Sequence, residues 1–413
     1  MREALSALTT RGRAFLAAGV VILVCSVLFG FEPLIAAGAL LVLLPLLAAF
    51  LVARGHYQLS LSRTLSPAQV TVGNKAQVTL DLGNASGTPS GRLLLEEQLP
   101  YVLGSRPRFV VDRLGHAGAA GWSRRIEYAV RSDLRGRFVI GPLSVRLNDP
   151  FGLVDLDRRF TGTSMLTVTP RVHPLPNVPL AGMWTGAGDN RPRSFASGSA
   201  EDITVREYRR GDELRRVHWR SSAKVGELMV RREEQPWQAH ATVLLDNRTS
   251  SHRGQGPMSS LEYAIEAAAS VAIHLVQRGF HVRLATASGH VIEADSVLES
   301  LAVLDAEALG HLDLRFLHQG NSGLVVAVLG DLHPADRPSL TRLKHSSSSA
   351  LALHLDVDQW AGGADRGVDA AEALGLLGAT GFLAMSCGPR DALPHVWQRL
   401  AEARSSRAPK VST

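Results

Sequence analysis

Two uncharged stretches near the start of the chain decide its architecture: AFLAAGVVILVCSVLFG at residues 14–30 and LIAAGALLVLLPLLAAFLVA at residues 34–53. A helix that crosses the hydrocarbon core of a bilayer needs roughly 20 apolar residues. The second stretch meets that length, and Phe31 can extend the first. Because only Phe31, Glu32 and Pro33 separate the stretches, we predict a transmembrane hairpin of two antiparallel helices.

The charges that flank the hairpin predict its orientation. Three arginines precede it within residues 1–13, Arg54 and Arg63 follow it, and the link between the helices carries only Glu32. Since positive flanks favour the cytoplasmic side, we expect both chain ends in the cytoplasm and the hairpin in the inner or plasma membrane. A cleaved signal peptide is the alternative, but no small-x-small cleavage site follows the first stretch.

The charge distribution argues against nucleic acid as a partner. The formal net charge is +6, but part of the excess flanks the hairpin and part lies at the end of the chain, in the tail 406–413. Between residues 201 and 234, nine Lys or Arg alternate with eight Asp or Glu, so the charges nearly cancel. A nucleic-acid surface would show an excess of one sign. This segment is instead typical of an ion-pair network or of a surface that meets a charged protein.

Residues 57–178 have the pattern of a β-sandwich. In AQVTLDL (76–82) the apolar side chains fall at every second residue, which suits a half-buried strand. Turn signals such as NASGTPSG (84–91) separate stretches of this kind at intervals of roughly 8–12 residues. The expected strands are Gln69–Thr71, Ala76–Leu82, Arg92–Glu96, Arg125–Val130, Phe138–Ile140, Leu143–Leu147 and Met165–Thr169. The carboxylates of this region, including Glu96 and Glu97, are scattered, so we interpret them as solvated and the domain as a structural spacer.

The second half of the chain has a different rhythm. A Gly-, Ser- and Pro-rich linker at 179–200 and the charged segment 201–238 lead into residues 239–405, where short apolar runs alternate with helical stretches. The expected strands are 241–246, 280–286, 323–331, 350–357 and 381–387, and the expected helices are 258–279, 297–309, 335–345, 369–377 and 391–404. This alternation predicts a doubly wound α/β domain with a parallel sheet.

Ligands of such sheets bind at the carboxyl ends of the strands. Asp246 follows the first strand, Ser250 lies in the loop after it, and Asp331 follows a central strand. Oxygen-bearing side chains on neighbouring loops suit Mg²⁺, which makes a metal-dependent hydrolase one hypothesis.

Signatures of the common enzyme classes are absent from the sequence. There is no Gly-Lys pair of a P-loop, no G-x-G-x-x-G after a strand, no G-x-S-x-G elbow and no H-E-x-x-H. His218 stands alone and is interpreted as a packed or interface residue rather than a base. We therefore expect a protein that is not an enzyme.

Within the charged segment, an Arg-Glu-Tyr triplet is followed by Gly-Asp, then by arginine, then by Trp-Arg. These residues are Arg206, Glu207, Tyr208, Gly211, Asp212, Arg215 or Arg216, Trp219 and Arg220. The pattern resembles the signature of the bacterial family known as domain of unknown function 58. Arg135–Gly136–Arg137, Asp149–Pro150–Phe151–Gly152–Leu153 and the pair of N-terminal membrane helices are also typical of that family.

The resemblance implies that the α/β domain is similar to the von Willebrand factor A fold. Such domains often hold Mg²⁺ through Asp-x-Ser-x-Ser, which maps here onto Asp246, Arg248 and Ser250. Arg248 takes the place of the first serine, and a cation there opposes a divalent ion and removes an oxygen ligand. We therefore expect an Arg248–Asp246 ion pair and no cofactor, with Mg²⁺ as the alternative.

The resemblance also implies a partner, because family members are often encoded beside MoxR-type AAA+ ATPases, which are cytoplasmic. The sequence thus favours a membrane-anchored, non-enzymatic scaffold or adaptor that binds such an ATPase through the signature residues. Two alternatives remain: the metal-dependent hydrolase, and an envelope-facing module that binds cell-wall material, which requires the opposite topology. The oligomeric state and the client protein are not predicted.

Overall fold

A computed structural model of the chain describes most of its residues. The described residues are 8–54, 59–87, 89–148, 151–177, 205–208, 217–231, 240–314, 322–361 and 370–405. The predicted linker 179–200 and the tail 406–413 lie outside them. The chain forms two compact units, Met1–Arg171 with Leu298–Leu304, and Val172–Val297 with Asp305–Thr413, and each is described by itself.

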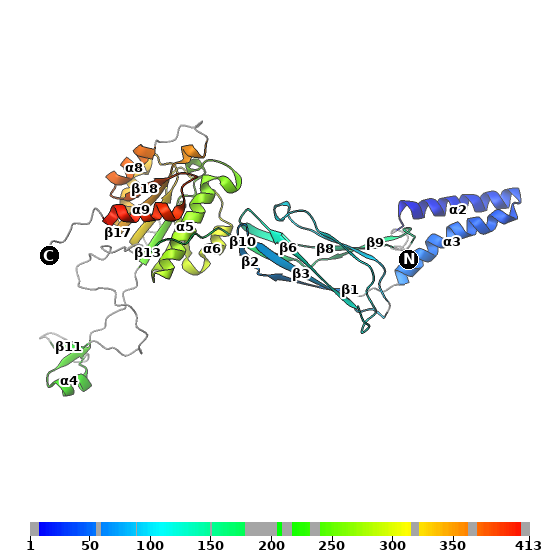
Figure 1. Cartoon of the computed structure of the whole chain (residues 1–413), viewed down its shortest axis with the longest axis horizontal. Helices are drawn as coiled ribbons and strands as arrows, with labels where there is room; N and C mark the ends of the chain where they lie inside the picture. Colours follow the sequence, from blue (N-terminus) through cyan, green and yellow to red (C-terminus); the bar gives the residue numbers. More distant parts are fainter. Residues whose placement is uncertain are drawn as a thin grey trace. The chain divides into compact units, whose positions relative to one another are not determined.

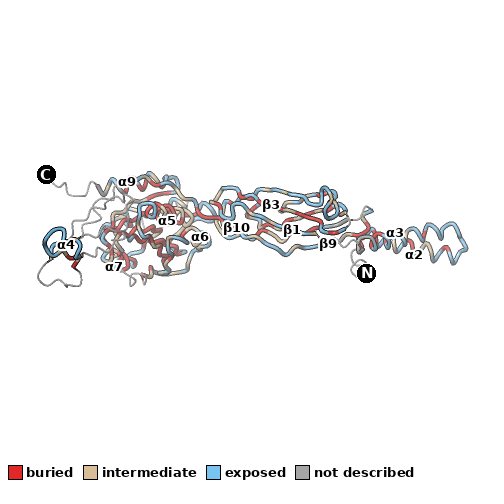
Figure 2. The backbone as a smooth tube through the Cα atoms, turned by 90° about the horizontal axis from the view of Figure 1, so that it is seen from below, coloured by how far each residue is buried: buried red, intermediate tan, exposed pale blue. Residues whose placement is uncertain are grey.

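The predicted hairpin is present as helices α2 (Thr10–Phe29) and α3 (Glu32–Arg54) (Figure 1). The link is shorter than expected, because Glu32 and Pro33 form the first turn of α3, where a proline costs no hydrogen bond. Only 17% and 22% of the two apolar stretches are buried, and Figure 2 shows both helices largely exposed. These helices are long and apolar enough to span a membrane, and they are not the buried core of a soluble unit.

Small residues bring the two helices together. A Cβ atom on Gly19 of α2 would lie 2.7 Å from a methyl carbon of Val42, and one on Gly38 of α3 would lie 2.9 Å from Leu23. Glycine at such contacts lets helix backbones approach closely, which is how apolar helices associate where water provides no driving force.

The β-rich part of the first unit contains all seven expected strands and three more. The strands are β1 (Leu59–Ser66), β2 (Gln69–Thr71), β3 (Lys75–Asn84), β4 (Leu93–Glu97), β5 (Arg108–Val111), β6 (Ser123–Arg131), β7 (Gly136–Ile140), β8 (Leu143–Asn148), β9 (Asp155–Phe160) and β10 (Ser164–Thr169). They form three sheets, β1-β3-β6, β2-β10-β7 and β5-β4-β8-β9, rather than the two of a simple sandwich. One apolar core, which includes Val78, Leu95 and Leu166, serves strands of all three sheets.

A buried ion pair in this core corrects the interpretation of two charges. The Arg63 side chain on β1 is 4% exposed and lies 2.5 Å from Oε1 of Glu97 on β4, which has no exposure. Burial raises the pKa of Glu97, and the charge of Arg63 opposes that rise. Glu97 is therefore not a solvated carboxylate, and Arg63 is not available as a positive flank at a membrane surface.

The second unit contains the predicted alternation of strands and helices. Its elements are β13 (His240–Leu245), α5 (Ser260–Gln277), β14 (His281–Thr286), β15 (Val291–Glu293), β16 (Ser322–Leu329), α7 (Arg337–His345), β17 (Ser347–Leu355), α8 (Ala370–Ala379), β18 (Leu383–Cys387) and α9 (Leu393–Ser405). Helix α6 (Val297–Ala302) follows β15 in the chain, but its residues from Leu298 onward belong to the first unit. The sheet order is β15-β14-β13-β16-β17-β18. Five strands are parallel, and β15, which the sequence did not indicate, is antiparallel at the edge.

Helices pack on this sheet through the buried strand residues. Leu244 of β13 shares an apolar cluster with Leu343 of α7 and Leu377 of α8. Helices α5 and α9 meet each other through the rings of His274 and Trp397, whose centroids are 5.8 Å apart. The residues of β13, β14 and β17 are mostly buried, and Figure 2 shows buried backbone among the labelled helices α5, α7 and α9.

One predicted helix is shorter than expected. The pattern predicts a helix over 297–309, but α6 ends at Ala302. The reason is a pairing between distant segments: the Glu307 N–H donates to the carbonyl of Asn247, and the Thr249 N–H donates to the carbonyl of Glu307. A helix continued to residue 309 would remove that pairing.

The buried histidine of β17 makes the second unit sensitive to acid. His354 is 2% exposed, and burial lowers its pKa to about 4. It stays neutral in the folded protein but takes up a proton near pH 6.5 once unfolded, so stability is present above pH 6.5 and is lost as the pH falls toward 4. Between pH 7.5 and 4.5 we expect this residue to cost about 2.5 kcal/mol of unfolding free energy. His354→Asn should remove that part of the pH dependence, as measured by urea unfolding of the full-length protein in detergent.

The matched control is His345→Asn, because His345 is exposed on α7. It should leave the pH dependence of the wild type unchanged. Equal pH dependence of His354→Asn and the wild type would contradict the prediction.

Candidate functional site

The loop after β13 lies at the point of the sheet where α/β proteins bind ligands. Strand β13 pairs with β14 on one side and with β16 on the other. The order in which strands are added to the sheet therefore reverses next to β13, which is where such sheets bind ligands. The Asp246 N–H donates to the carbonyl of Val328 at 2.9 Å. The Asn247 side chain accepts from the Ala287 N–H at 3.1 Å and donates to the carbonyl of Asp305 at 2.9 Å. These hydrogen bonds hold the loop after β13 against β16, against the residue that follows β14 and against the segment that follows α6.

Arg248 fills the space between two carboxylates at this edge. Its Nε and Nη2 atoms donate to the two oxygens of Asp246 at 2.9 and 2.8 Å. Its Nη1 and Nη2 atoms donate to the two oxygens of Asp336 at 2.9 and 3.2 Å. The predicted Arg248–Asp246 ion pair is confirmed, and Asp336 is a second partner that the sequence did not indicate.

The three charges are removed from water. The side chains of Arg248, Asp246 and Asp336 are 3%, 0% and 2% exposed. Burial by itself would lower the pKa of Arg248, but hydrogen bonds and charge from Asp246, and then from Asp336, outweigh it and raise the pKa. The guanidinium therefore stays protonated, and bidentate charge-assisted hydrogen bonds of this kind are strong and specific in geometry.

The turn before α7 positions the second carboxylate. Asp336 ends a short 3-10 helix, Pro334–Asp336, and its Oδ2 atom accepts from the N–H of His333 at 3.1 Å. Asp331 and Asp336 both lie between β16 and α7, so the sequence does not distinguish which of them reaches Arg248.

Arginines also face the other residues that the sequence proposed as metal ligands. Nη2 of Arg253 lies 3.3 Å from Oδ2 of Asp331, and its Nη1 donates to the carbonyl of Ser250 at 2.6 Å. Among the described residues, no group of three or more His, Cys, Asp or Glu side chains could hold a metal ion. Metal binding at Asp246, Ser250 and Asp331 stays a prediction, and each of these residues is already in contact with an arginine.

A histidine next to this cluster pairs with a serine that substrate cannot reach. Nε2 of His252 lies 2.6 Å from the carbonyl oxygen of Asp246, and Nδ1 lies 3.0 Å from Oγ of Ser260. With Nε2 donating, Nδ1 accepts from the hydroxyl. Burial lowers the pKa of His252, and Ser260 has no exposure. The pair ties the loop to the start of α5 and does not present a nucleophile.

A glycine permits the close approach of the two loops. A Cβ atom on Gly330 would collide with the carbonyl oxygen of Ser251. The next N–H along the chain, that of Asp331, donates to this same carbonyl at 2.9 Å. Any larger residue at 330 would push the loop after β16 away from the loop after β13.

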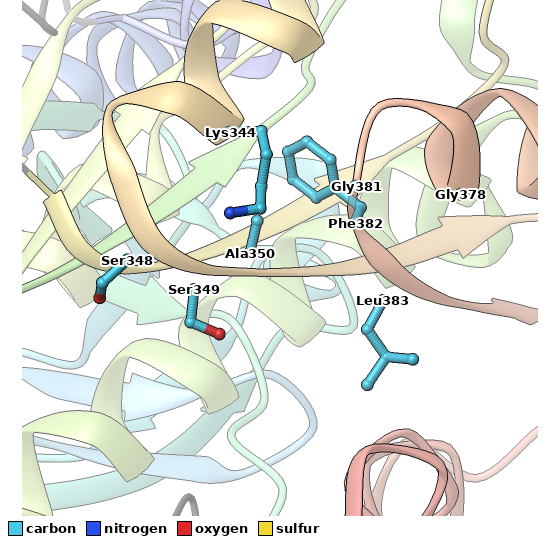
Figure 3. A pocket seen from close by; sticks show the side chains of 8 residues that line it. All are labelled: Lys344, Ser348, Ser349, Ala350, Gly378, Gly381, Phe382 and Leu383. Atoms are coloured by element: carbon cyan, nitrogen blue, oxygen red, sulfur yellow. The ribbon is translucent and has the colours of Figure 1, made fainter. Parts of the chain in front are cut away.

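The pocket in Figure 3 lies at the opposite edge of the sheet. It has a volume of about 240 Å³ and is lined by Lys344, Ser348, Ser349, Ala350, Gly378, Gly381, Phe382 and Leu383. Residues 348–350 lie near the amino end of strand β17, and Leu383 is the first residue of strand β18. Ligand pockets usually exceed roughly 300 Å³ and bring several polar groups together. Here the only charged side chain in the lining is that of Lys344.

The described part of the signature segment forms a small α/β element. Strands β11 (Val205–Glu207) and β12 (Met229–Arg231) pair antiparallel, and α4 (Trp219–Val225) precedes β12. His218 begins α4, since its Nδ1 accepts from the N–H of Ser221 at 3.3 Å. His218 thus has a capping role in the fold.

Three of the signature residues are exposed on this element. Trp219 is 67% exposed, and Arg220 beside it is also exposed. Val225, at the end of the same helix, is 59% exposed. Glu207 is exposed and Tyr208 half-buried, and the Tyr208 N–H donates to the carbonyl of Leu228 at 2.8 Å.

The other signature residues cannot be placed in this way. Gly211, Asp212, Arg215 and Arg216 lie outside the described residues, and Arg206 is described only in its backbone.

Removal of the buried guanidinium should destabilise the second unit strongly. Arg248→Met leaves two buried carboxylates without a cation, and breaking a buried ion pair in this way costs about 3–5 kcal/mol. We expect a loss of that size in the unfolding free energy, measured by denaturant titration of the full-length protein in detergent. The triple variant Arg248→Met, Asp246→Asn, Asp336→Asn removes all three charges and should recover part of the loss. A loss below about 1 kcal/mol for Arg248→Met would show that the cluster is not a stabilising contact.

Comparisons with known proteins give one family match. Residues 204–294 match the family described as Protein of unknown function DUF58. This range begins within the charged segment and runs through β13, the Arg248 loop, α5 and β14. No curated protein matches the sequence.

Solved structures resemble parts of the chain only distantly. The CARDB domain of a Pyrococcus furiosus protein is 15% identical, with 27% of this chain and 93% of that chain covered and a TM-score of 0.20. An alkylpurine DNA glycosylase of Pseudomonas fluorescens is 19% identical, with 33% and 39% covered and a TM-score of 0.19. β-Glucosidase 3B of Thermotoga neapolitana is 12% identical, with 27% and 17% covered and a TM-score of 0.13. Scores this low assign neither a fold nor a function.

The family match and the signature residues therefore agree. The match over residues 204–294 supports the resemblance of this chain to the domain of unknown function 58 family.

Proposed function

We propose that this protein is a membrane-anchored, non-enzymatic scaffold that presents a binding surface to a protein partner in the cytoplasm. The observation that carries the proposal is the state of the carboxyl edge of the α/β sheet. At the position where ligands of such sheets bind, a guanidinium with 3% exposure is bonded to two carboxylates. Among the described residues, an internal contact thus fills the position next to β13, which argues against a substrate site there.

The order of the strands supports a von Willebrand factor A-like domain. An antiparallel edge strand, β15, is followed by parallel strands whose order reverses next to β13. The Asp-x-Ser-x-Ser motif that holds Mg²⁺ in many such domains falls on the loop of Asp246, Arg248 and Ser250. In this chain the guanidinium of Arg248 provides a fixed positive charge beside Asp246, so we propose that the domain works without a metal.

The surface of the signature segment supports a protein partner. Tryptophan and arginine are the residues that most often dominate the energy of protein interfaces, and Trp219 and Arg220 are adjacent and exposed on α4. By family resemblance we propose a MoxR-type AAA+ ATPase as the partner, in the assembly or activation of another protein complex.

The two apolar helices support the anchor. Arg11 and Arg13 are exposed at the start of α2, and Arg54 ends α3. With Arg63 buried against Glu97, these residues remain as the positive flank, and such a flank supports the proposed cytoplasmic position of both helix ends. A MoxR-type ATPase would be on that same side.

Loss of the exposed tryptophan should weaken capture of the partner. Trp219→Ala removes an aromatic side chain that is 67% exposed, so we expect the dissociation constant for the cognate MoxR-type ATPase to rise about tenfold or more. The measurement is biolayer interferometry with the full-length protein in nanodiscs. Arg215→Glu with Arg216→Glu tests the charged part of the signature in the same assay.

Trp122→Ala is the matched control, because Trp122 is a half-exposed tryptophan in the β-rich unit. It should bind the ATPase like the wild type. If Trp219→Ala and the arginine variant both bind with unchanged affinity, the signature segment is not the interface.

Reporter fusions test the side of the membrane. A phosphatase that is active only outside the cytoplasm, fused after Thr413, should be inactive, whereas a fluorescent protein that matures in the cytoplasm should be bright there. The matched control carries the phosphatase after Phe31, between the two helices, where it should be active. An active fusion after Thr413 would instead favour the envelope-facing module.

A further inference from the structure

The hairpin and the β-rich part of the same unit meet at a defined joint. The Thr9 N–H donates to the carbonyl of Leu153 at 2.9 Å, and the Thr9 hydroxyl donates to the carbonyl of Gly152 at 2.8 Å. Leu8 forms an antiparallel bridge with Val154. Because Thr9 also caps α2, accepting from the Gly12 N–H at 3.2 Å, one residue both starts the helix and holds the loop before β9.

Apolar packing closes the joint. Leu8, Leu153 and Val154 form a buried cluster with Ala48 and Ala49 of α3. These contacts come from three segments that are far apart in the sequence, so the loop is held by both helices of the hairpin.

A glycine makes the close approach possible. Gly12 is buried in the first turn of α2, and a Cβ atom there would collide with the carbonyl oxygen of Leu153. Substitution at this position would therefore separate the loop from the helix.

The joint lies at the level where the uncharged part of the hairpin begins. Leu16 of α2 and Leu44 of α3, which belong to the two uncharged stretches, pack against the same cluster. At 1.5 Å per residue, Thr9 lies about 8 Å along the helix from Ala14, the first residue of the uncharged stretch. A loop fixed at this level, on helices that cross a bilayer, lies among the lipid headgroups.

The side chains around the joint suit that environment. Phe151, next to Gly152 in the loop, is 62% exposed. Arg11 and Arg13 are exposed on the first turn of α2, and they form no ion pair with a described residue. Aromatic rings favour the interface between water and hydrocarbon, and arginines beside it attract anionic headgroups.

We propose that the loop 151–154 is a third membrane contact of this protein. Phe151 inserts among the headgroups of the leaflet from which the β-rich unit projects, and Arg11 and Arg13 pair with anionic lipid phosphates. The inference rests on the proposed membrane insertion of the hairpin and adds a lipid-binding role for the β-rich part of the first unit. The contact restricts how this β-rich part can tilt on the hairpin.

Depth-dependent quenching tests the proposal on the full-length protein. Cys25 and Cys387 are replaced by alanine, Phe151→Cys is labelled with an environment-sensitive fluorophore, and the protein is placed in nanodiscs of phosphatidylcholine and phosphatidylglycerol. We expect a spin label near the lipid headgroup to quench this fluorophore at least about twofold more than one at Tyr101→Cys. Tyr101 is the matched control because it is 88% exposed and follows Glu97, at the opposite end of the paired strands β4 and β8 from Asn148.

Retention of the native Cys25 as the single labelled residue separates the two proposals. Cys25 lies within α2 and is exposed, so a spin label deep in the acyl chains should quench it if the hairpin is inserted. Quenching at Cys25 without excess quenching at position 151 would overturn the membrane contact and leave the anchor intact. Absence of quenching at Cys25 would overturn both. Position 151 could also become more shielded as protein density rises, without being quenched by the lipid labels. That result would assign the loop to contacts between copies of the protein and overturn the inference.

Gly12→Val tests whether the joint sets the depth of the loop. The added side chain should release the loop and reduce headgroup quenching at position 151 by about half, with Cys25 unaffected. Ala18→Val, on an exposed position of α2, is the matched control and should change neither signal. Equal quenching in Gly12→Val and the control would contradict a role of the joint.

Discussion

The carboxyl edge of the α/β sheet depends on one guanidinium held between two carboxylates. Taking three charges out of water costs several kcal/mol per ion, and only well-aligned hydrogen bonds offset such a cost. Arg248 supplies four, two to Asp246 and two to Asp336. Because these carboxylates belong to the loop after β13 and the turn before α7, the contact fixes the two sides of the position where the strand order reverses.

This closed edge bears on where function can reside. A site for a metal or a substrate needs polar groups that are aligned and still available, whereas Asp246, Asp331 and Asp336 are all bonded to arginines. The described part of the signature segment shows the opposite property. It buries Val217 and Val230 but leaves Trp219 exposed, and a two-stranded element of this size is marginally stable by itself. A partner that covers the tryptophan would supply the missing burial.

Local signals in the sequence predicted most of the elements, although not strands β1, β5, β9 and β15, and pairings between distant segments decided the rest. Helix α5 was predictable because Ser259 caps it and an apolar face follows. The end of α6 was not, because Glu307 pairs with the loop after β13. The partners of Arg248 were half predictable: the place of Arg248 in the Asp-x-Ser-x-Ser motif indicated an ion pair with Asp246, but only packing selects Asp336 over Asp331. Burial of charge is likewise a property of the fold and not of the local pattern.

The joint between Thr9 and Leu153 has the same origin, since it unites residues that are more than a hundred positions apart. Its polar groups are backbone N–H and carbonyl groups and one hydroxyl, so no charge pattern in the sequence indicates it. A scaffold needs its parts fixed on the anchor and its binding residues unused by the fold. If the protein is a scaffold as proposed, the joint fixes the β-rich part of the first unit on the anchor, and the arginine cluster stabilises the second unit. The exposed Trp219 is then a binding residue that the fold does not use.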